Sequence, residues 1–336
     1  MKEKKTIENL DFSSDCEPIS HLVGSHPEWN ESYYFVFCSK QQKIGGVTRI
    51  GFKPNKKEGM TFFLLFLPDG TVAIHQAIEK MGDSSYPSAL RVDGMLHHRN
   101  GDGTWNYDFK GDMILLKNPH DVLKLRAQPS VALGIQKASM NLTFTPINCV
   151  YEYSSHMSAE SRELGKRAGD AHWEQIAKVQ GNVVLGDQTF KVANVLGQRD
   201  HTHGVRDWTG IRSWLYYVIW FSEELAVNPA AIVAEDGKVS TGGFIFKNGR
   251  NIPIKRIRIL EQKFIDEIFP VSSKLELLDE DGSTHTLEGK TGPTVPLPFS
   301  DEKGRTSILT QSFGTFEMDG VLGGYGTFET LRAKRK

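Results

Sequence analysis

The sequence predicts an all-β protein built from two antiparallel β-barrel or sandwich units. Short runs rich in β-branched and aromatic residues recur along the chain, with turn signals roughly every 8–12 residues between them. The 32 glycines suit many tight turns and bulges, and no long amphipathic helix is visible. We therefore expect few helices, all of them short.

The first half of the chain opens with a polar segment and becomes strand-like at Trp29. Residues 1–25 are expected to form an irregular arm that lies on the folded body. The run Thr61–Leu67 leads into Pro68-Asp69-Gly70, where proline fixes φ and glycine accepts a positive φ, so a tight turn is predicted. Further strands are predicted at 33–38, 104–116 and 138–147.

A change in composition marks the expected boundary between the two units. Residues 154–175 read SSHMSAESRELGKRAGDAHWEQ, and a short helix is predicted at residues 159–166. We therefore expect an N-terminal unit over residues 1–165 and a C-terminal unit over residues 166–336, with the charged motif described below in the second.

Composition and charge narrow the class of protein. A formal net charge of -1 with both signs interspersed argues against a nucleic-acid or anionic-membrane partner. Three cysteines without metal-ligand spacing, no secretory signal and no run of about 18 apolar residues predict a soluble, cytoplasmic protein with reduced thiols and no membrane span. Composition and charge are compatible with a homodimer.

Familiar cofactor and nucleophile motifs are missing from the sequence. The glycine-rich pieces TGG and GVLGGYG lack a following helix or a Lys-Ser/Thr pair, so they are not phosphate loops. No Gly-x-Ser-x-Gly elbow occurs, and no cysteine has the context of a nucleophile. No cofactor is expected.

The densest group of charges lies between Arg199 and Asp207, where six of nine residues can carry charge. On a strand, Arg199, His201 and His203 share one face, while Asp200 and Thr202 take the other. Gly204 is expected to break this alternation with a turn or bulge and to re-aim Arg206 and Asp207. Such a cluster is either an acid–base site with perturbed pKa values or an Arg–Asp ladder that ties two strands or units together.

A metal site is the competing interpretation of the same segment. His201 and His203 could present two imidazoles to zinc or iron, with His172 or Glu174 as further ligands. Only the His-x-His spacing is suggestive, so no metal is predicted.

Two other segments carry candidate site residues. In WNESYYF, Glu31, Tyr33 and Phe35 share one strand face, and an inward Glu31 would be a second acid–base group or a partner for an arginine. An exposed strand edge is the alternative for Glu31. His172 and Glu174 flank a tryptophan in the connector, where they either face a cleft between the units or are structural.

Several phrases, in order, resemble one superfamily. These are WNESYYF, GGVTRIGFKPN, AHWEQIAKVQG, GQRDHTHGVRDW and DGVLGGYGTFE. Together, from about Trp29 to Glu329, they resemble the carotenoid 1,2-hydratase-like proteins (hydroxyneurosporene synthase and AttH type), and most closely an uncharacterised branch whose central motif reads RDHSWGxRDW. The resemblance implies two lipocalin-like barrels. It also implies hydration, dehydration or cyclisation of hydrophobic unsaturated molecules, by protonation of a carbon–carbon double bond without an organic cofactor.

Residue by residue, the central motif of this branch is matched with one departure. The matching residues are Arg199, Asp200, His201, Gly204, Arg206, Asp207 and Trp208. Thr202-His203 stands where the branch has Ser-Trp, so an imidazole replaces an indole. This departure weakens the two-histidine metal site and makes His203 the first place to look for specificity.

The first function hypothesis is a cofactor-independent lyase or isomerase for a hydrophobic alkene or alcohol, such as a terpenoid or steroid. Asp207 or Asp200 would donate the proton, and His201 or His203 would position water or take the proton back. The substrate-binding residues expected around them are Arg199, Arg206, Trp208, Glu31, Tyr33, Trp29 and His172. The second hypothesis is a non-catalytic carrier of a lipid, steroid or terpenoid, in which the charges only close the barrel.

Overall fold

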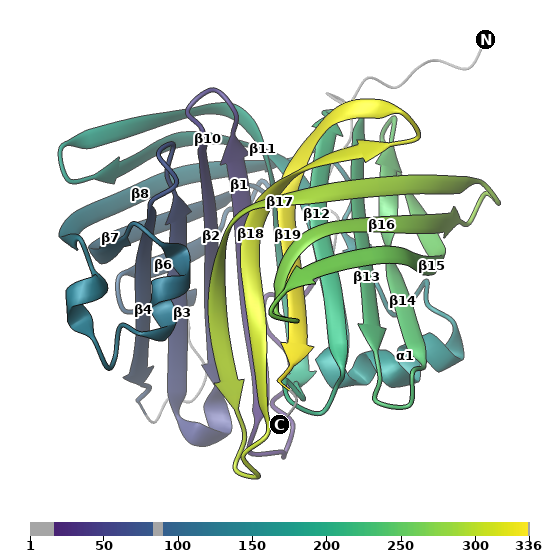
Figure 1. Cartoon of the computed structure of the whole chain (residues 1–336), viewed down its shortest axis with the longest axis horizontal. Coiled ribbons are helices and arrows are strands. Elements are labelled where there is room, and N and C mark those ends of the chain that lie inside the picture. Colours follow the sequence, from purple (N-terminus) through teal and green to yellow (C-terminus); the bar gives the residue numbers. More distant parts are fainter. Residues whose placement is uncertain (1–16, 83–89, 335–336) are drawn as a thin grey trace.

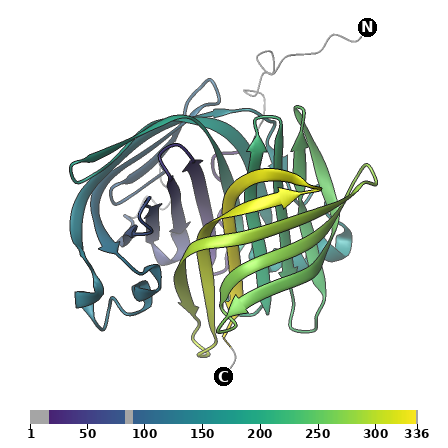
Figure 2. The ribbon, with the colours of Figure 1, turned by 45° about the horizontal axis from the view of Figure 1, so that its top comes forward.

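The computed structural model describes residues 17–82 and 90–334, and its architecture is all-β, as predicted. Two curved antiparallel sheets lie side by side, the first from the N-terminal part of the chain and the second from the C-terminal part (Figures 1 and 2). The lipocalin-like fold class implied by the resemblance is confirmed. The part of the expected arm before residue 17 lies outside the described residues.

The first sheet contains β1 to β11 in the order β4-β3-β2-β1-β11-β10-β8-β7-β6-β5, with β9 paired to β10. Residues Val72–Ile74 of β4 also pair with β7, which closes the main strands into a ring. Its strands are β1 (Trp29–Ser39), β2 (Ile44–Lys53), β3 (Glu58–Phe66), β4 (Val72–Lys80), β5 (Leu90–Val92), β6 (Met95–Arg99), β7 (Trp105–Leu116), β8 (Gly134–Pro146), β9 (Tyr151–Glu152), β10 (Ala171–Leu185) and β11 (Gln188–Val205).

The second sheet is a closed barrel in which β12 to β19 follow one another and β19 pairs back to β12. Its strands are β12 (Ser213–Ser222), β13 (Leu225–Val233), β14 (Val239–Lys247), β15 (Arg250–Ile265), β16 (Phe269–Asp279), β17 (Thr284–Ser300), β18 (Thr306–Met318) and β19 (Val321–Ala333). Hairpin connections explain this order, since each strand pairs with its neighbour in the sequence.

Short helices connect the strands. These are η2 (Pro54–Lys56), η3 (Pro119–Leu123), η4 (Pro129–Val131), α1 (Ala159–Gly165) and η5 (Lys166–Ala168). The helix α1 agrees with the prediction at residues 159–166; it is capped by the Ser158 side chain, which accepts a hydrogen bond from the Ser161 amide. It lies at one end of the barrel strands β13 and β14, where Ser240 donates to the Ser161 carbonyl (Figure 1).

The division between the sheets differs from the predicted boundary. Strands β10 and β11, which a boundary at residue 166 assigns to the second unit, pair with β8 and β1 in the first sheet. The change of sheet falls between Val205 and Ser213, and the motif strand therefore belongs to the first sheet. The polar segment 154–175 indicated a connector, but strand pairing is long-range and does not follow local composition.

Strand β1 is buried on both faces because alternate residues enter different cores. Tyr33 and Phe35 pack inside the first sheet. Tyr34 and Val36 point the other way and pack, in one apolar layer, with barrel residues such as Trp220. We call this layer between the two sheets the interface layer. A third core, around Tyr217 and Phe328, fills the barrel.

Gly204 does not break the motif strand, contrary to expectation. The pairing of β11 with β1 continues in register through Gly204 to Val205. Gly204 has φ +115°, and a Cβ there would lie 2.5 Å from the backbone nitrogen of Asp170. A glycine is therefore required here because the backbone at Asp170, just before β10, packs closely against Gly204. The alternation of the motif is preserved up to the end of the strand.

Among the described residues, no helix has the length and apolar character that a membrane crossing requires.

Candidate functional site

The two faces of β11 carry two separate polar clusters. Arg199 and His201 point into the first sheet, whereas Asp200 points into the interface layer, as the predicted alternation requires. We call the first group the inner cluster; it consists of Glu17, His21, Glu31, Arg199 and His201. We call the second the interface cluster; it consists of Arg49, His172, Glu174, Asp200, Arg206, Tyr216 and Glu329.

His201 is the centre of the inner cluster. Its Nδ1 contacts a carboxylate oxygen of Glu17, and its Nε2 lies 2.7 Å from Oε1 of Glu31. The same Glu31 oxygen lies 2.8 Å from Nδ1 of His21, and Arg199 forms a 2.7 Å ion pair with Glu17. The side chains of His201 and Glu31 are fully buried. Three elements supply this cluster: the segment before β1, strand β1 and strand β11.

Charge pairing decides the protonation of the inner cluster. Burial alone would raise the pKa of Glu17, but Arg199 and His201 lower it to about 2. Burial likewise opposes a charged His201, yet its hydrogen bonds to Glu17 and Glu31 raise its pKa. The ion pairs of the inner cluster therefore hold the segment around Glu17 and His21 against the first sheet.

Aromatic rings wall the inner cluster. Tyr33 stacks on His201 with ring centroids 4.3 Å apart, and Trp173 lies 5.3 Å from the same ring. His203 stacks on His21 at 4.0 Å, and its buried Nδ1 has no hydrogen-bond partner among the described residues. Trp29 lies 6.1 Å from the His203 ring. The structure thus brings together six predicted residues of the inner face: Trp29, Glu31, Tyr33, Arg199, His201 and His203.

Glu174 is the most connected carboxyl of the interface cluster. Tyr216 of the barrel donates to its Oε1 at 2.6 Å, and the amide of Gln198 donates to its Oε2 at 2.6 Å. Nε2 of His172 also lies 2.6 Å from Oε1, while Nδ1 of that ring lies 2.6 Å from the Thr202 hydroxyl. Burial raises the pKa of Glu174 to about 8 and lowers that of His172 to about 4.

A second acid enters the cluster from the barrel. Glu329 accepts hydrogen bonds from Nε1 of Trp214 at 3.0 Å and from the Gln311 amide. Burial and the neighbouring Asp200 raise the pKa of Glu329 to about 8, although both donors favour its charged form. The interface cluster therefore contains carboxyls from both sheets whose pKa values are raised by burial.

Asp200 is the carboxyl of the interface cluster whose hydrogen bonds are incomplete among the described residues. It is 9% exposed, and its Oδ1 is buried without a hydrogen-bond partner among the described residues. Ligand atoms of Asp200, His172 and Glu174 all lie within 4.8 Å of one another. Burial raises the pKa of Asp200 to about 6, even though His172 and the nearby arginines oppose this shift. A buried, poorly satisfied carboxyl with such a pKa is typical of acid–base sites.

Two arginines, the buried Arg49 and the partly buried Arg206, bring positive charge to the same place. The guanidinium of Arg49 runs over Gly51, where a Cβ would lie 2.5 Å from Nη1, and it donates to Oδ1 of Asn30 at 3.0 Å. Within the described part of the chain, Nη1 of Arg49 and Nε of Arg206 have no hydrogen-bond partner, and no carboxylate lies within 4.0 Å of either guanidinium. Burial and the proximity of Arg206 lower the pKa of Arg49 to about 9.

The end of the motif lies outside both clusters. Asp207 is partly exposed in the segment between β11 and β12, where it accepts a 2.8 Å hydrogen bond from the Gly210 amide and lies 3.6 Å from Arg305. Trp208 stacks on Phe299 at 4.5 Å, in a small core at the end of the barrel. The structure does not bring these two predicted residues to Asp200.

The same arrangement separates the residues of the alternative metal site that was considered from the sequence. His201 and His203 lie on the inner face, whereas His172 and Glu174 lie on the opposite face of the sheet. The sequence did not point to five residues that the structure adds to the two clusters: Glu17, His21, Arg49, Tyr216 and Glu329. Arg49 lies in the strand-like phrase GGVTRIGF and could have been found as a charge in an apolar run; the others carry no local signal.

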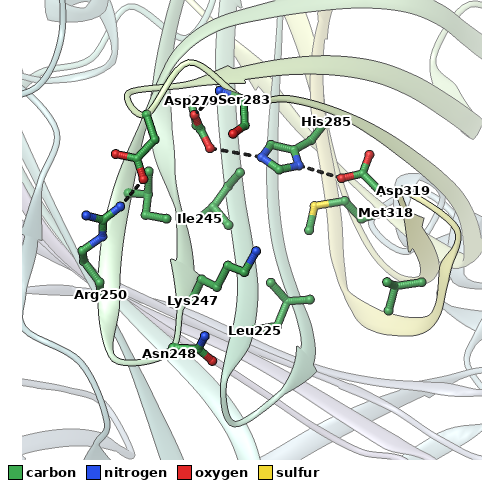
Figure 3. A pocket seen from close by; sticks show the side chains of 13 residues that line it. Leu225, Ile245, Lys247, Asn248, Arg250, Asp279, Ser283, His285, Met318 and Asp319 are labelled. Atoms are coloured by element: carbon green, nitrogen blue, oxygen red, sulfur yellow. Dashed lines mark hydrogen bonds and ion pairs between the residues drawn. The ribbon is translucent and has the colours of Figure 1, made fainter. Parts of the chain in front are cut away.

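A hollow of about 600 Å³ lies elsewhere, at one end of the barrel (Figure 3). Apolar side chains such as Ile245 and Met318 line it, together with Lys247 and Arg250. His285 spans its rim, with Nε2 3.1 Å from Asp279 and Nδ1 2.6 Å from Asp319. None of the described residues that line this hollow belongs to the motif or to either cluster.

Comparison with known proteins places the whole described chain in one family. A family model described as a domain of unknown function (DUF7064) matches residues 17–334. The chain belongs to this family. A search of curated proteins gave no significant match.

Solved structures share the fold at low sequence identity. A protein assigned as an AttH from Nitrosomonas europaea has a TM-score of 0.60 and 14% identity, over 91% of this chain and 94% of that chain. Kievitone hydratase from Nectria haematococca has a TM-score of 0.55 and 11% identity, over 95% and 94% of the two chains. CghA follows at 0.52 and 8%, over 91% and 87%. At these identities the likeness shows the fold alone.

Proposed function

We propose that this protein is an acid–base lyase or isomerase that hydrates, dehydrates or cyclises a hydrophobic small molecule without an organic cofactor. The observation that carries the proposal is Asp200, a buried carboxyl with a pKa of about 6 and an oxygen that no described protein atom satisfies. A group of this kind can donate or accept a proton near neutral pH. The site is the interface cluster.

The neighbours of Asp200 supply the other roles. Asp200 donates the proton to an alkene carbon or to a departing hydroxyl group. His172, Glu174 and Tyr216 form a continuous hydrogen-bonded chain. This chain either takes up the proton that the substrate releases or holds the water molecule that reacts. Arg49 and Arg206 bind an oxygen substituent of the substrate through their free N–H groups. The ring of Tyr34, beside Asp200, stabilises developing positive charge through its π face.

The other residues predicted from the sequence are less suited to the role of proton donor. Asp207 is engaged at a turn, and His201 is engaged by two carboxylates in the inner cluster. His203 and Arg199 also face the inner cluster, so their effect on the proposed reaction would be indirect.

The fold neighbours support a reaction of this class. One of them is named a hydratase, and another, CghA, has been solved with the compound Sch210972. The substrate is proposed only as a class: an unsaturated or alcohol-bearing molecule, such as a terpenoid or steroid.

The hollow in Figure 3 favours one other function. Its apolar floor and charged rim suit an amphipathic ligand, and it lies away from Asp200. In that case the protein is a carrier of a lipid, steroid or terpenoid, and the interface cluster only joins the two sheets.

Turnover in D2O separates these functions. Wild type, Asp200→Asn and Asp207→Asn are incubated with a panel of prenyl alcohols and conjugated enones, and products are analysed by mass spectrometry. We expect wild type to add or remove one water, or to place deuterium on carbon, and Asp200→Asn to be at least about 100-fold slower. The matched variant Asp207→Asn keeps its activity. Equal turnover by Asp200→Asn contradicts the proposal, and binding without turnover by all three proteins favours the carrier.

A further inference from the structure

The inner cluster contains three potential metal ligands that converge on one point. Nδ1 of His21, a carboxylate oxygen of Glu31 and Nε2 of His201 all lie within 4.8 Å of one another. Oε1 of Glu31 is 2.8 Å from the His21 nitrogen and 2.7 Å from the His201 nitrogen. Ligand atoms on a tetrahedral zinc ion stand roughly 3.3–3.4 Å apart, so a small outward shift would admit an ion.

The surroundings of His201 are those of a metal-bound imidazole. Its second nitrogen, Nδ1, contacts the carboxylate of Glu17, which is the arrangement that fixes the tautomer and orientation of a ligating histidine. Arg199 in turn holds Glu17 by a 2.7 Å ion pair. Tyr33 and Trp173 pack on the ring of His201 and prevent it from turning away.

Charge also favours a cation here rather than in the interface cluster. The inner cluster has two carboxylates, Glu17 and Glu31, against one arginine. Ligand atoms of His172, Glu174 and Asp200 also lie within 4.8 Å of one another, but the guanidinium groups of Arg49 and Arg206 add positive charge beside them. A cation in the second group would lie beside two guanidinium groups, whereas in the first it would lie near one arginine that is already paired with Glu17.

We propose that His21, Glu31 and His201 bind a divalent metal ion of the zinc class, with Glu17 as the positioning residue for His201. This set differs from the His-x-His pair of the motif, because His203 is not one of the three converging ligands. Three protein ligands leave a fourth position for water or another small ligand, as in catalytic rather than structural zinc sites. One ligand, His21, comes from the segment before β1, so metal binding fastens this segment to β1 and β11.

Cobalt binding to the purified full-length chain tests the site. After treatment with a chelator, the wild type is titrated with Co²⁺, and we expect one equivalent to give the visible absorption bands of four-coordinate cobalt. His21→Ala and Glu31→Gln should lose these bands, and Glu17→Gln should weaken Co²⁺ binding by about 10–100-fold. Zinc bound by the protein as purified is counted by elemental analysis.

Matched histidine variants keep the assignment falsifiable. His203→Ala removes the neighbouring imidazole on the same strand face and should retain the bands, as should His172→Ala in the interface cluster. Circular dichroism and the Tm confirm that each variant is folded; His21 precedes β1, so its loss leaves the sheet pairing intact. A wild type that binds neither Co²⁺ nor Zn²⁺ overturns the proposal. So does loss of the bands in His203→Ala or His172→Ala but not in His21→Ala.

Discussion

The hydroxyl of Tyr216 in β12 donates a 2.6 Å hydrogen bond to the buried carboxyl of Glu174 in β10. This contact joins the barrel to the first sheet at the centre of the interface cluster. The same Glu174 oxygen is shared with His172, so one carboxyl serves both as a structural link and as a member of the proposed proton path. Stability and reactivity can therefore be separated only by variants that remove one partner at a time.

Replacing Tyr216 with Phe should lower the free energy of unfolding by about 1–3 kcal/mol, because a buried carboxyl loses a donor. Urea denaturation followed by tryptophan fluorescence measures the change. Tyr325→Phe is the matched control, since Tyr325 packs in the same layer and its hydroxyl has no hydrogen bond among the described residues. Equal stability of the two variants would show that the hydrogen bond of Tyr216 does not stabilise the contact between the two sheets.

The pH dependence of turnover should follow Asp200. A proton donor must be protonated, and burial raises the pKa of this carboxyl to about 6. We therefore expect kcat/KM to be constant below about pH 6 and to fall tenfold per pH unit above it. A rate profile from about pH 5 to 8 measures this. A rate that rises with pH would instead make Asp200 the base, and a flat profile would exclude it as the titrating group.

Gly51→Ala should weaken the binding of anionic ligands without unfolding the protein. The new Cβ would lie 2.5 Å from Nη1 of Arg49, and the flexible guanidinium would move away from its present place. Fluorescence titration with 1-naphthoate and with 1-naphthylmethanol should show a weaker affinity for the anion only. Gly101→Ala, where a Cβ meets nothing within 4 Å, is the control. An unchanged affinity for 1-naphthoate would exclude Arg49 from ligand binding.

The ion pairs of Glu17 should stabilise the fold at neutral pH and not in acid. The pKa of this buried carboxyl is about 2 in the folded protein and about 4.5 otherwise, so its contribution is present above pH 4.5 and is lost as the pH falls towards 2. The wild type should therefore be more stable than Glu17→Gln by on the order of 3 kcal/mol at pH 7, and the difference should shrink in acid. Chemical denaturation at several pH values measures it, and a constant difference would contradict the assignment.

Local patterns in the sequence predicted the fold class and the facing of the motif. Alternation placed Arg199 and His201 on one face and Asp200 on the other, and the structure confirms this because β11 is covered on both sides. Turn residues and apolar runs likewise indicated short antiparallel strands. These features depend on neighbours in the sequence, and so they can be read from it.

Features that depend on distant partners could not be predicted. The boundary at residue 166 was wrong for the sheets because β11 pairs with β1, far earlier in the chain. Glu17 and His21 lie in a polar segment whose contacts with β11 leave no local pattern. Asp207 and Asp200 were equivalent in the sequence; the strand ends at Val205, and this decides which of them is buried.

The back-to-back placement of the clusters on β11 limits how this family can vary. Each cluster takes every second residue, so one residue inserted within the motif would exchange their side chains: arginine and histidine would enter the interface layer, and aspartate the interior of the first sheet. Both groups would then lose their partners at once. Substitution can alter the surroundings of one cluster alone, as at His203 beside the inner cluster, whereas a change in motif length alters both clusters. The spacing of the motif should therefore be more constant among family members than the identity of its residues.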